Sequence, residues 1–438
     1  MTSSSRKDER GIPIRRLIVG IAVIVMVAFS SSGGLQSERQ MVDEIVLEED
    51  KVAVFVNTSS GLGAMQLLPY LTVYALGLAA ILYYVFVQRR DKARAMLLWI
   101  FASSAFAIPT LVDVLRSYNV SITQALVPLA LFLPLILRSD DFDWFISLVR
   151  RVCLIYVAAT VFYTVFWFEN ATLDCGGCPL GPVRLHGFSE HANSLSVIPI
   201  IYFAADLSSQ RKWTVLRIFQ WFAVLGLLLF SQSKTPMVAA LISAGMVWIY
   251  LARGQLKAIA VSIIGLIWVT ATTIWTIIIP AMGGGRMYDS ANDLTGRPRI
   301  WAYAIDLVKE NYIGYGTGFL QNTDPTGAGL FNATGLIFNS AHNQFLGTLG
   351  QGGVLGLICL IIYLAMLGWT IVRSKMPERS GSLFLFIVLV VWGVTEQILM
   401  ATIVTERFFM HLTLLTLVIL INKNTIEERM SENSKTVV

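Results

Sequence analysis

The sequence predicts an all-α integral membrane protein with about twelve transmembrane helices. Of its 438 residues, 55% are hydrophobic and 14% are charged, and the mean hydropathy is +0.66. Soluble domains carry about 25% charged residues, so the composition argues against a water-soluble fold. Apolar runs recur along the whole chain, and Lys and Arg residues gather in alternate connections between them.

The apolar runs are the predicted transmembrane helices, because roughly 17–25 apolar residues cross the hydrocarbon core of a bilayer. In chain order they cover residues 17–31, 63–87, 95–112, 122–137, 152–168, 192–207, 218–230, 236–252, 258–279, 353–372, 383–404 and 408–421. The first run follows a basic stretch, as in a signal peptide. No A-x-A cleavage site precedes "SSSGG", so we favour a retained helix.

The positions of Lys and Arg predict the orientation, since cytoplasmic loops retain positive charge. With the first residues inside, most of the 33 basic residues fall in cytoplasmic segments, and both termini are cytoplasmic. The net charge of +5 is then mainly this asymmetry, and no nucleic-acid partner is needed to explain it. Membrane lipids are the expected surroundings.

Two outward segments are longer than a connection requires. No internal repeat separates a soluble domain, so residues 1–438 are interpreted as one polytopic membrane domain. Residues 33–60 form an acidic outer loop, and residues 280–352 form a large outer loop between the ninth and tenth spans. Within the second loop, Trp301, Ile305, Val308 and Tyr312 share one helical face. This amphipathic helix is either a surface helix or a lid over an active site.

The four cysteines fall into two groups. Cys153 and Cys359 lie in predicted spans, whereas Cys175 and Cys178 form a C-x-x-C in an outward loop. A C-x-x-C can mark a redox or metal site, but no second pair or suitably spaced histidine pair accompanies it. We favour a short disulfide in an oxidising compartment.

The outward loops contain few basic residues, and those present are clustered. Arg184 and His191 lie in "GPVRLHGFSEHANS", Lys234 in "FSQSKTPM", and Arg297 with Arg299 in "LTGRPRIW". His342 begins the polar-to-apolar stretch "HNQFLGTLGQGGVLG". Under the predicted topology, all four segments face the outer side of the membrane. Single cations at helix ends often extend toward lipid headgroups, and we interpret His186 and His411 as structural. As a set, the cations predict a site for a polyanion such as a lipid diphosphate.

The same stretches resemble the O-antigen ligase and Wzy-polymerase superfamily over about residues 152–409. His342, Asn343, Gly353 and Gly356 match its H-[NSQ]-x9-G-x-x-[GTY] pattern. "SQSKTPMVAAL" resembles its S-[RK]-[TSG] turn, and "RLHGFSEHANSL" resembles an element that aligns Arg184, Gly187 and Asn193. "GRPRIWAYAIDLVKENYIGYGTGF" resembles a segment that aligns Arg297 and Trp301. Lys234 stands where many relatives have Arg, and His191 where many have Pro or Lys.

The resemblance implies a GT-C-type glycosyltransferase of the bacterial inner membrane with a periplasmic active site. Such an enzyme takes glycan from undecaprenyl diphosphate and needs no cofactor and no metal. Arg184, Lys234 and Arg297 would bind the diphosphate, with His191, Asn193, Arg299, Trp301 and Asn343 in support. His342 would accept a proton from an acceptor hydroxyl, with inversion at the anomeric carbon, or would hydrogen-bond the diphosphate.

Three readings of function remain in order of preference. The H-N-x9-G match favours an O-antigen ligase acting on lipid A–core, ahead of an O-antigen or exopolysaccharide polymerase. A polysaccharide transporter or flippase would usually show ionisable residues at the membrane midplane and repeat-like halves. The predicted spans are nearly free of charge, so we place that reading third; a receptor would leave the motifs unexplained.

Overall fold

The computed structural model describes most of the predicted helices. The described residues are 12–30, 64–87, 93–118, 120, 122–174, 180–189, 191–209, 212–251, 297–323, 340–374, 379–399 and 405–436. The acidic loop 33–60, Cys175 and Cys178, the predicted span 258–279 and much of the loop 280–352 lie outside them.

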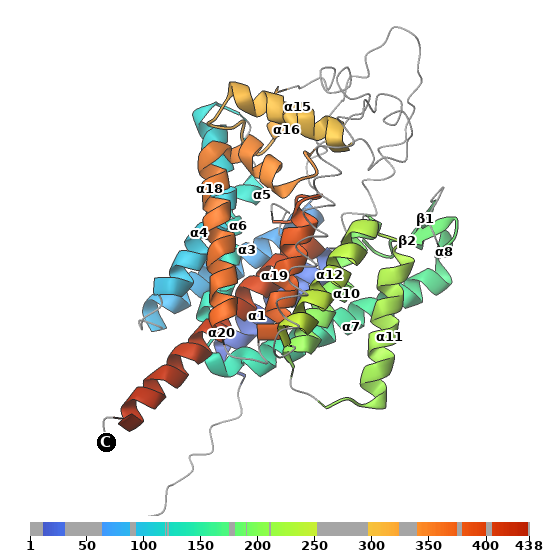
Figure 1. The fold of residues 1–438 in the computed structure, drawn as a ribbon, viewed down its shortest axis with the longest axis vertical. Helices are drawn as coiled ribbons and strands as arrows, with labels where there is room; N and C mark the ends of the chain where they lie inside the picture. The colour runs from blue at the N-terminus through green and yellow to red at the C-terminus, as the bar shows by residue number, and fades with distance from the viewer. Residues whose placement is uncertain are drawn as a thin grey trace, which may run out of the picture.

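The fold is a bundle of helices with one small hairpin (Figure 1). The longer helices are α1 (Ile14–Phe29), α3 (Ala64–Val87), α4 (Ala93–Leu115), α7 (Phe142–Phe166), α10 (Val197–Ser208), α11 (Val215–Phe230), α12 (Lys234–Leu251), α15 (Arg297–Glu310), α18 (Gln344–Arg373), α19 (Arg379–Gly393) and α20 (Glu406–Thr436). The short elements are α5 (Ile122–Ala125), α6 (Val127–Leu131), η1 (Leu133–Ile136), η2 (Ser139–Asp141), α8 (Phe168–Ala171), α9 (Ala192–Leu195), α16 (Phe319–Thr323) and the antiparallel strands β1 (Thr172–Asp174) and β2 (Val183–Leu185).

Four helical segments of the described chain are long and apolar enough to cross a membrane: Leu67–Val87, Ala95–Leu115, Ser139–Phe166 and Gln344–Arg373. Shorter apolar helices cover Ile122–Ile136, Ala192–Ser208, Val215–Phe230, Lys234–Tyr250 and Arg379–Gly393. These segments confirm a helical membrane protein, while the number of spans stays a prediction.

Several predicted boundaries are wrong. The run 122–137 is broken into short helices, with Pro128 and Pro134 near the starts of α6 and η1, where proline lacks a backbone donor. The fifth span starts at Phe142 instead of residue 152, and the tenth starts at Gln344 instead of residue 353. The run 383–404 stops being helical after Gly393, and the last helix continues to Thr436.

The core of the bundle is built around α20 and α19. Residues 408–421 of α20 are all buried, and Trp392 at the end of α19 is the largest fully buried side chain. By contrast α3, α7, α11 and α18 expose many Leu, Ile and Phe side chains. An apolar surface of this kind suits contact with lipid, which is as apolar as these side chains.

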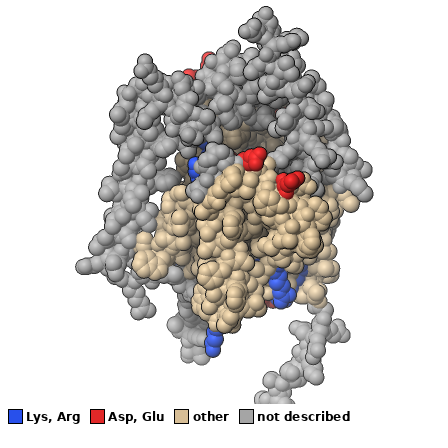
Figure 2. Space-filling view, turned by 90° about the vertical axis from the view of Figure 1, so that its right-hand side faces the viewer, with Lys and Arg blue, Asp and Glu red and all other residues tan. Residues whose placement is uncertain are grey.

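Charged groups collect at the two ends of the bundle. At the lower end, Arg15 of α1 bonds Asp141 before α7, and Lys423 of α20 bonds carbonyls at Leu135 and Leu137. Figure 2 shows a broad uncharged middle, Lys and Arg side chains at the lower end of this face, and Asp and Glu side chains near its upper border. Arg15 of the first described helix and Lys423 of the last described helix therefore lie at the same end.

Candidate functional site

The carboxylate of Glu396 gathers the predicted site residues at the upper end of the bundle. Its Oε1 lies 2.7 Å from Arg297 Nη2, and its Oε2 lies 3.3 Å from His342 Nδ1. Asn193 Nδ2 approaches Oε1 at 3.4 Å, and Arg407 Nη1 lies 3.9 Å from Oε2. We name Glu396, His342, Arg297 and Arg407 the outer cluster.

The segment after α19 brings Glu396 to the start of α18. The α19 helix ends at Gly393, and the following backbone folds against the first turn of α18. Asn343 Nδ2 donates to the Val394 carbonyl at 2.8 Å, and Leu399 N donates to Gln344 Oε1 at 2.8 Å. These two bonds bracket Glu396, so its carboxylate is held beside His342.

The backbone of His342 is in an unusual conformation, with φ 44°. A positive φ costs a non-glycine residue roughly 1–3 kcal/mol and persists only when the surroundings impose it. The next residue, Asn343, is the N-cap of α18 and accepts from Phe345 N and Leu346 N, both at 2.9 Å. The His-Asn pair of the sequence pattern is thus a turned histidine followed by a helix cap.

Arg297 enters the site from above, as the first residue of α15. Its Nη1 donates to the Thr395 carbonyl at 2.7 Å while Nη2 binds Glu396. These two hydrogen bonds, to Thr395 and Glu396, hold the guanidinium of Arg297 beside His342. Trp301 lies one turn later with its Nε1 buried and without a partner in the described structure; the side chain of Arg299 is outside the described part.

Arg184 is supplied by strand β2 and paired with His191. After β2 the backbone bends at Gly187, with φ 60°, and Ala171 O accepts from both His186 N and Gly187 N at 3.0 Å. Arg184 Nη2 lies 2.8 Å from His191 Nε2. An arginine only donates, so Nε2 is the acceptor and Nδ1 carries the hydrogen. The 3.1 Å approach of Asn193 N to His191 Nδ1 is then a close contact and not a second acceptor bond.

Lys234 lies at the edge of this region and outside the outer cluster. It is the exposed first residue of α12. The turn before it reaches the Arg184 hairpin, because Gln232 Nε2 donates to Val183 O at 2.7 Å and Gln232 Oε1 accepts from Leu180 N at 2.9 Å. The structure therefore brings the turn beside the strand that carries Arg184, with the lysine side chain directed to solvent.

The charges of the outer cluster are strongly coupled. Burial raises the pKa of Glu396, but the hydrogen bond from His342 and the charges of Arg407 and Arg297 outweigh it and lower that pKa to about 2. Burial and the charge of Arg184 lower the pKa of His191 to about 4. A single carboxylate thus faces two arginines, with Arg184 behind His191. This surplus of positive charge can bind an anion.

The ionised Glu396 also defines the state of His342. A carboxylate accepts and does not donate, so Nδ1 of His342 carries the hydrogen of that contact. In the neutral ring the lone pair is then on Nε2, the atom opposite the carboxylate. The His342 side chain is 26% exposed, so it is accessible to a substrate hydroxyl.

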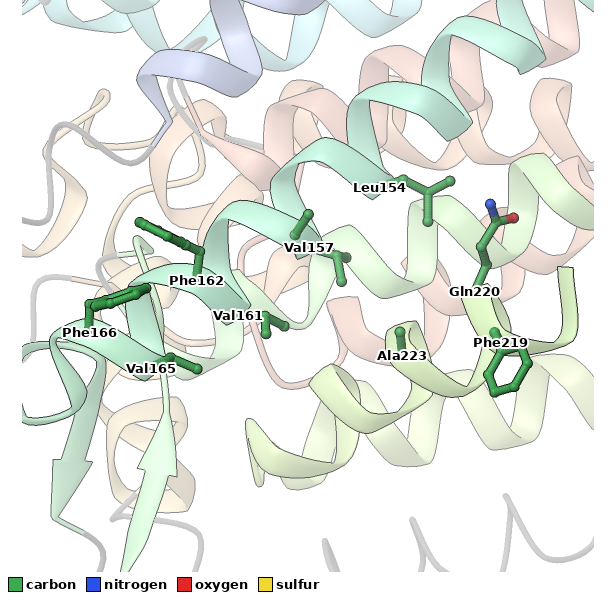
Figure 3. Close-up of a pocket in the computed structure, with 10 residues that line it drawn as sticks. Leu154, Val157, Val161, Phe162, Val165, Phe166, Phe219, Gln220 and Ala223 are labelled. Atoms are coloured by element: carbon green, nitrogen blue, oxygen red, sulfur yellow. The ribbon is translucent and has the colours of Figure 1, made fainter. Parts of the chain in front are cut away.

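Two further features of the described residues bear on the site. No group of three or more His, Cys, Asp or Glu side chains within them could hold a metal ion. An apolar groove of about 600 Å³ lies elsewhere, between α7 and α11, and its lining includes Val161, Phe162, Phe166 and Phe219 (Figure 3). Its lining among the described residues is apolar except for Gln220, in contrast to the charged outer cluster.

Glu396 and Arg407 are site residues that the sequence reasoning missed. Glu396 falls inside the predicted span 383–404, where an ionisable residue is costly and usually functional. The predicted spans, interpreted as nearly free of charge, include Glu396 in 383–404 and Asp206 in 192–207. Arg407 follows the predicted span 383–404 in the sequence and matches none of the motifs. Structural roles for His186 and His411 agree with their contacts, to Ser189 O and Tyr363 Oη respectively.

Comparison with known proteins shows which family part of the chain resembles. Residues 219–361 match the family model Wzy_C, O-antigen ligase. The chain is 26% identical over 204 residues to an O-antigen ligase of Pseudomonas aeruginosa PAO1, an alignment that covers 45% of this chain and 46% of that protein. The match thus spans about half the length of the curated relative. Over these residues the chain is similar to the O-antigen ligase family.

Proposed function

We propose that the chain transfers a glycan from undecaprenyl diphosphate to an acceptor sugar hydroxyl at the periplasmic face of the inner membrane. The acceptor we favour is lipid A–core, which makes the reaction an O-antigen ligation. One observation carries the proposal: His342 and a set of arginines converge on the buried carboxylate of Glu396. The arrangement offers a proton acceptor and an anion site side by side.

His342 acts as the general base in this proposal. Glu396 fixes the Nδ1–H tautomer and leaves Nε2 to take the proton of the attacking hydroxyl, the relation found in hydrolase triads. Glu396 also stabilises the imidazolium that forms. General base catalysis of this kind contributes about 10²- to 10⁴-fold in rate.

The arginines stabilise the leaving group. The acceptor oxygen forms a bond to the anomeric carbon from the side opposite the diphosphate, and the bond from that carbon to the diphosphate oxygen breaks, so the configuration inverts. The electron pair leaves with undecaprenyl diphosphate, and the hydroxyl proton remains on His342. Arg184, Arg297 and Arg407 face the charge that develops, with Lys234 at the edge. Each step uses groups of the chain and requires no metal.

The groove between α7 and α11 is suited to the isoprenoid chain of the donor. Its lining is almost wholly apolar, and it follows α7 from Leu154 to Phe166 (Figure 3), roughly 18 Å at 1.5 Å per residue. At the upper end of α7, Tyr163 stacks on Phe188 at 4.4 Å between ring centroids, so the groove leads toward the hairpin that carries Arg184. A lipid held there would present its diphosphate near the arginines.

The orientation follows from the same arrangement. The outer cluster lies at the end of the bundle opposite to Arg15 and Lys423, both of which contact the segment 135–141. With that basic end in the cytoplasm, both chain ends are cytoplasmic and the cluster faces the periplasm.

A ligase is preferred to a polymerase because the curated relative is an O-antigen ligase. Both reactions use the same donor and the same cluster, and they differ in the acceptor. Purified protein given undecaprenyl-diphosphate glycan together with lipid A–core should form glycan-capped core and release undecaprenyl diphosphate. Lengthened lipid-linked glycan as the main product would identify a polymerase instead, and movement of intact donor across a vesicle without cleavage would identify a carrier.

The mechanism is tested by substitution of His342 in that assay. His342→Ala should reduce transfer by about 10²-fold or more at normal protein level and membrane insertion. Arg407→Gln should keep turnover but raise the KM for the donor about tenfold, as expected for one charged contact. His186→Ala is the matched control, because His186 donates to Ser189 O and is given no part in the proposed transfer. Near-normal transfer by His342→Ala would remove the proposal.

A further inference from the structure

We infer that Asp113, together with Gly316 and Gly353, forms a clasp that positions Arg297 and His342 from a distance. This inference rests on the proposed function, because it assigns positioning residues for the same site. The clasp joins three parts of the chain: the end of α4, the kink of α18, and the loop between α15 and α16 (Figure 1).

The kink of α18 creates the docking surface for that loop. Gly353 has φ 62° and ψ −162° inside the helix, which leaves backbone groups of the preceding turn without helical partners. The loop supplies them: Tyr315 N donates to Gly350 O at 2.8 Å, Gly316 N donates to Gln351 O at 3.0 Å, and Val354 N donates to Tyr312 O at 2.9 Å. A side chain at Gly353 would lie 2.2 Å from Tyr312 O, so only glycine permits this approach.

Asp113 closes the clasp from the other side. It is fully buried at the end of α4, and its carboxylate accepts from Thr317 N at 3.1 Å and from Thr317 Oγ1 at 2.6 Å. A Cβ at Gly316, which has φ 80°, would lie 1.7 Å from Asp113 Oδ1. A buried carboxylate is costly unless its hydrogen bonds are made, so the loop has one well-defined seat on α4.

A small separate core connects the clasp to the site. Ala304 and Val308 of α15 pack with Phe319 and Leu320 of α16 and with Ala341. Ala341 is fully buried and directly precedes His342, whose positive φ must be imposed by its surroundings. The core therefore holds the backbone on which His342 turns.

The helix α15 carries the same constraint to Arg297. It runs over 14 residues from Arg297 to Glu310, roughly 20 Å, and its end enters the clasp, where Asn311 Nδ2 donates to Gly314 O at 2.7 Å. Arg297 thus stands at one end of a rigid helix whose other end is fixed on α4 and α18. Loosening the clasp displaces Arg297 and His342 together, and a misplacement of about 1 Å can cost up to 10²-fold in rate.

The test is a double-mutant cycle between Asp113 and Arg297, measured as kcat/KM for glycan transfer by the full chain in detergent or nanodiscs. Asp113→Ala should lower kcat/KM about tenfold or more, and Asp113→Asn, which keeps one acceptor oxygen, should lose less. In an Arg297→Gln background the further loss caused by Asp113→Ala should be clearly smaller, because one of the two residues that the clasp positions is already gone and only the displacement of His342 remains. Asp306→Asn is the matched control, an exposed carboxylate on α15 whose side chain is 72% exposed.

The experiment can contradict the positioning role of the clasp without contradicting the proposed function of His342. Normal kcat/KM for Asp113→Ala, or losses that add fully in the double variant, would overturn the positioning role while His342→Ala still abolished transfer. Should Asp113→Ala accumulate poorly, Thr317→Val is the second variant, because it removes only the 2.6 Å hydroxyl bond. Thr317→Val should lower kcat/KM less than Asp113→Ala does, and its effect should also shrink in the Arg297→Gln background. If the two losses in kcat/KM add fully in the double variant, the inference is contradicted.

Discussion

Two buried carboxylates, Glu396 and Asp206, each hold two arginines, yet the two regions differ in what they leave open. Asp206 binds Arg217 at 2.7 Å and Arg150 at 2.9 Å, and all three side chains are at most 9% exposed. Glu396 is equally buried, but Arg297, Arg407 and His342 around it are 12%, 23% and 26% exposed. Similar charge pairing therefore serves two purposes, and the exposure of the cations tells them apart.

Aromatic side chains help to bury Asp206 and its two arginines. Trp221 Nε1 donates to Asp206 at 2.6 Å, and the Arg217 guanidinium lies 4.4 Å from the Trp213 ring centroid. Asp206 and its two arginines tie α7, α10 and α11 together. The cations of the outer cluster differ in being partly exposed, which leaves them accessible to a substrate.

The largest expected effect is on the outer carboxylate. Glu396→Gln keeps the size of the side chain but removes the charge that fixes the tautomer of His342. Transfer should fall by about 10²- to 10⁴-fold, and the thermal midpoint in detergent should also fall, because the ionised carboxylate stabilises the folded chain at neutral pH. Initial rates with the lipid-linked donor measure the first, and thermal unfolding of the same sample measures the second. If Glu396→Gln lowers the thermal midpoint but leaves the specific activity unchanged, Glu396 is structural like Asp206, and the proposed difference between the two regions is wrong.

Substitution of the inner carboxylate should reverse that pattern. Asp206→Ala leaves two buried arginines without a counter-charge, which costs about 3–5 kcal/mol of folding stability. The amount of folded protein in the membrane and its thermal midpoint should fall, while the specific activity of the folded fraction stays near normal. Asp140→Ala is the control, since this carboxylate also pairs with an arginine but is 63% exposed, and pairs of that kind contribute about 0–1 kcal/mol.

The smallest expected effect is a pH dependence from His191. Its folded pKa of about 4 lies below the ordinary 6.5, so between those values the unfolded chain binds more protons than the folded one. Stability therefore falls as the pH drops from 6.5 toward 4. The thermal midpoint should decrease by a few degrees between about pH 7 and pH 5, and His191→Gln should flatten that slope. If His191→Gln leaves the slope of thermal midpoint against pH unchanged, another group causes the pH dependence.

The low pKa of Glu396 predicts a second, more acidic window. Because its folded pKa of about 2 lies below the ordinary 4.5, the stabilisation is complete above about pH 4.5 and is lost as the pH falls toward 2. The two windows can thus be separated in one series of unfolding measurements.

The sequence by itself determined the class of the protein and much of its site. Composition and apolar runs require a helical membrane protein, because only lipid accepts so much apolar surface on the outside of a bundle. The pattern of motifs pointed to His342, Arg297 and Arg184, and the structure brings the first two onto one carboxylate and places the third behind His191. These residues could be found because polar groups between apolar runs stand out locally.

Only the tertiary structure decided which groups complete the site and what holds it. Glu396 looked like part of an apolar span until the end of α19 at Gly393 placed it beside His342. Asp113 and Thr317 are 204 residues apart in the chain, so no local pattern could pair them. Gly353 matched a motif, but its role as a helix kink that receives a loop depends on a distant segment. Contacts between remote residues follow from packing and backbone geometry, which a local reading of the sequence does not contain.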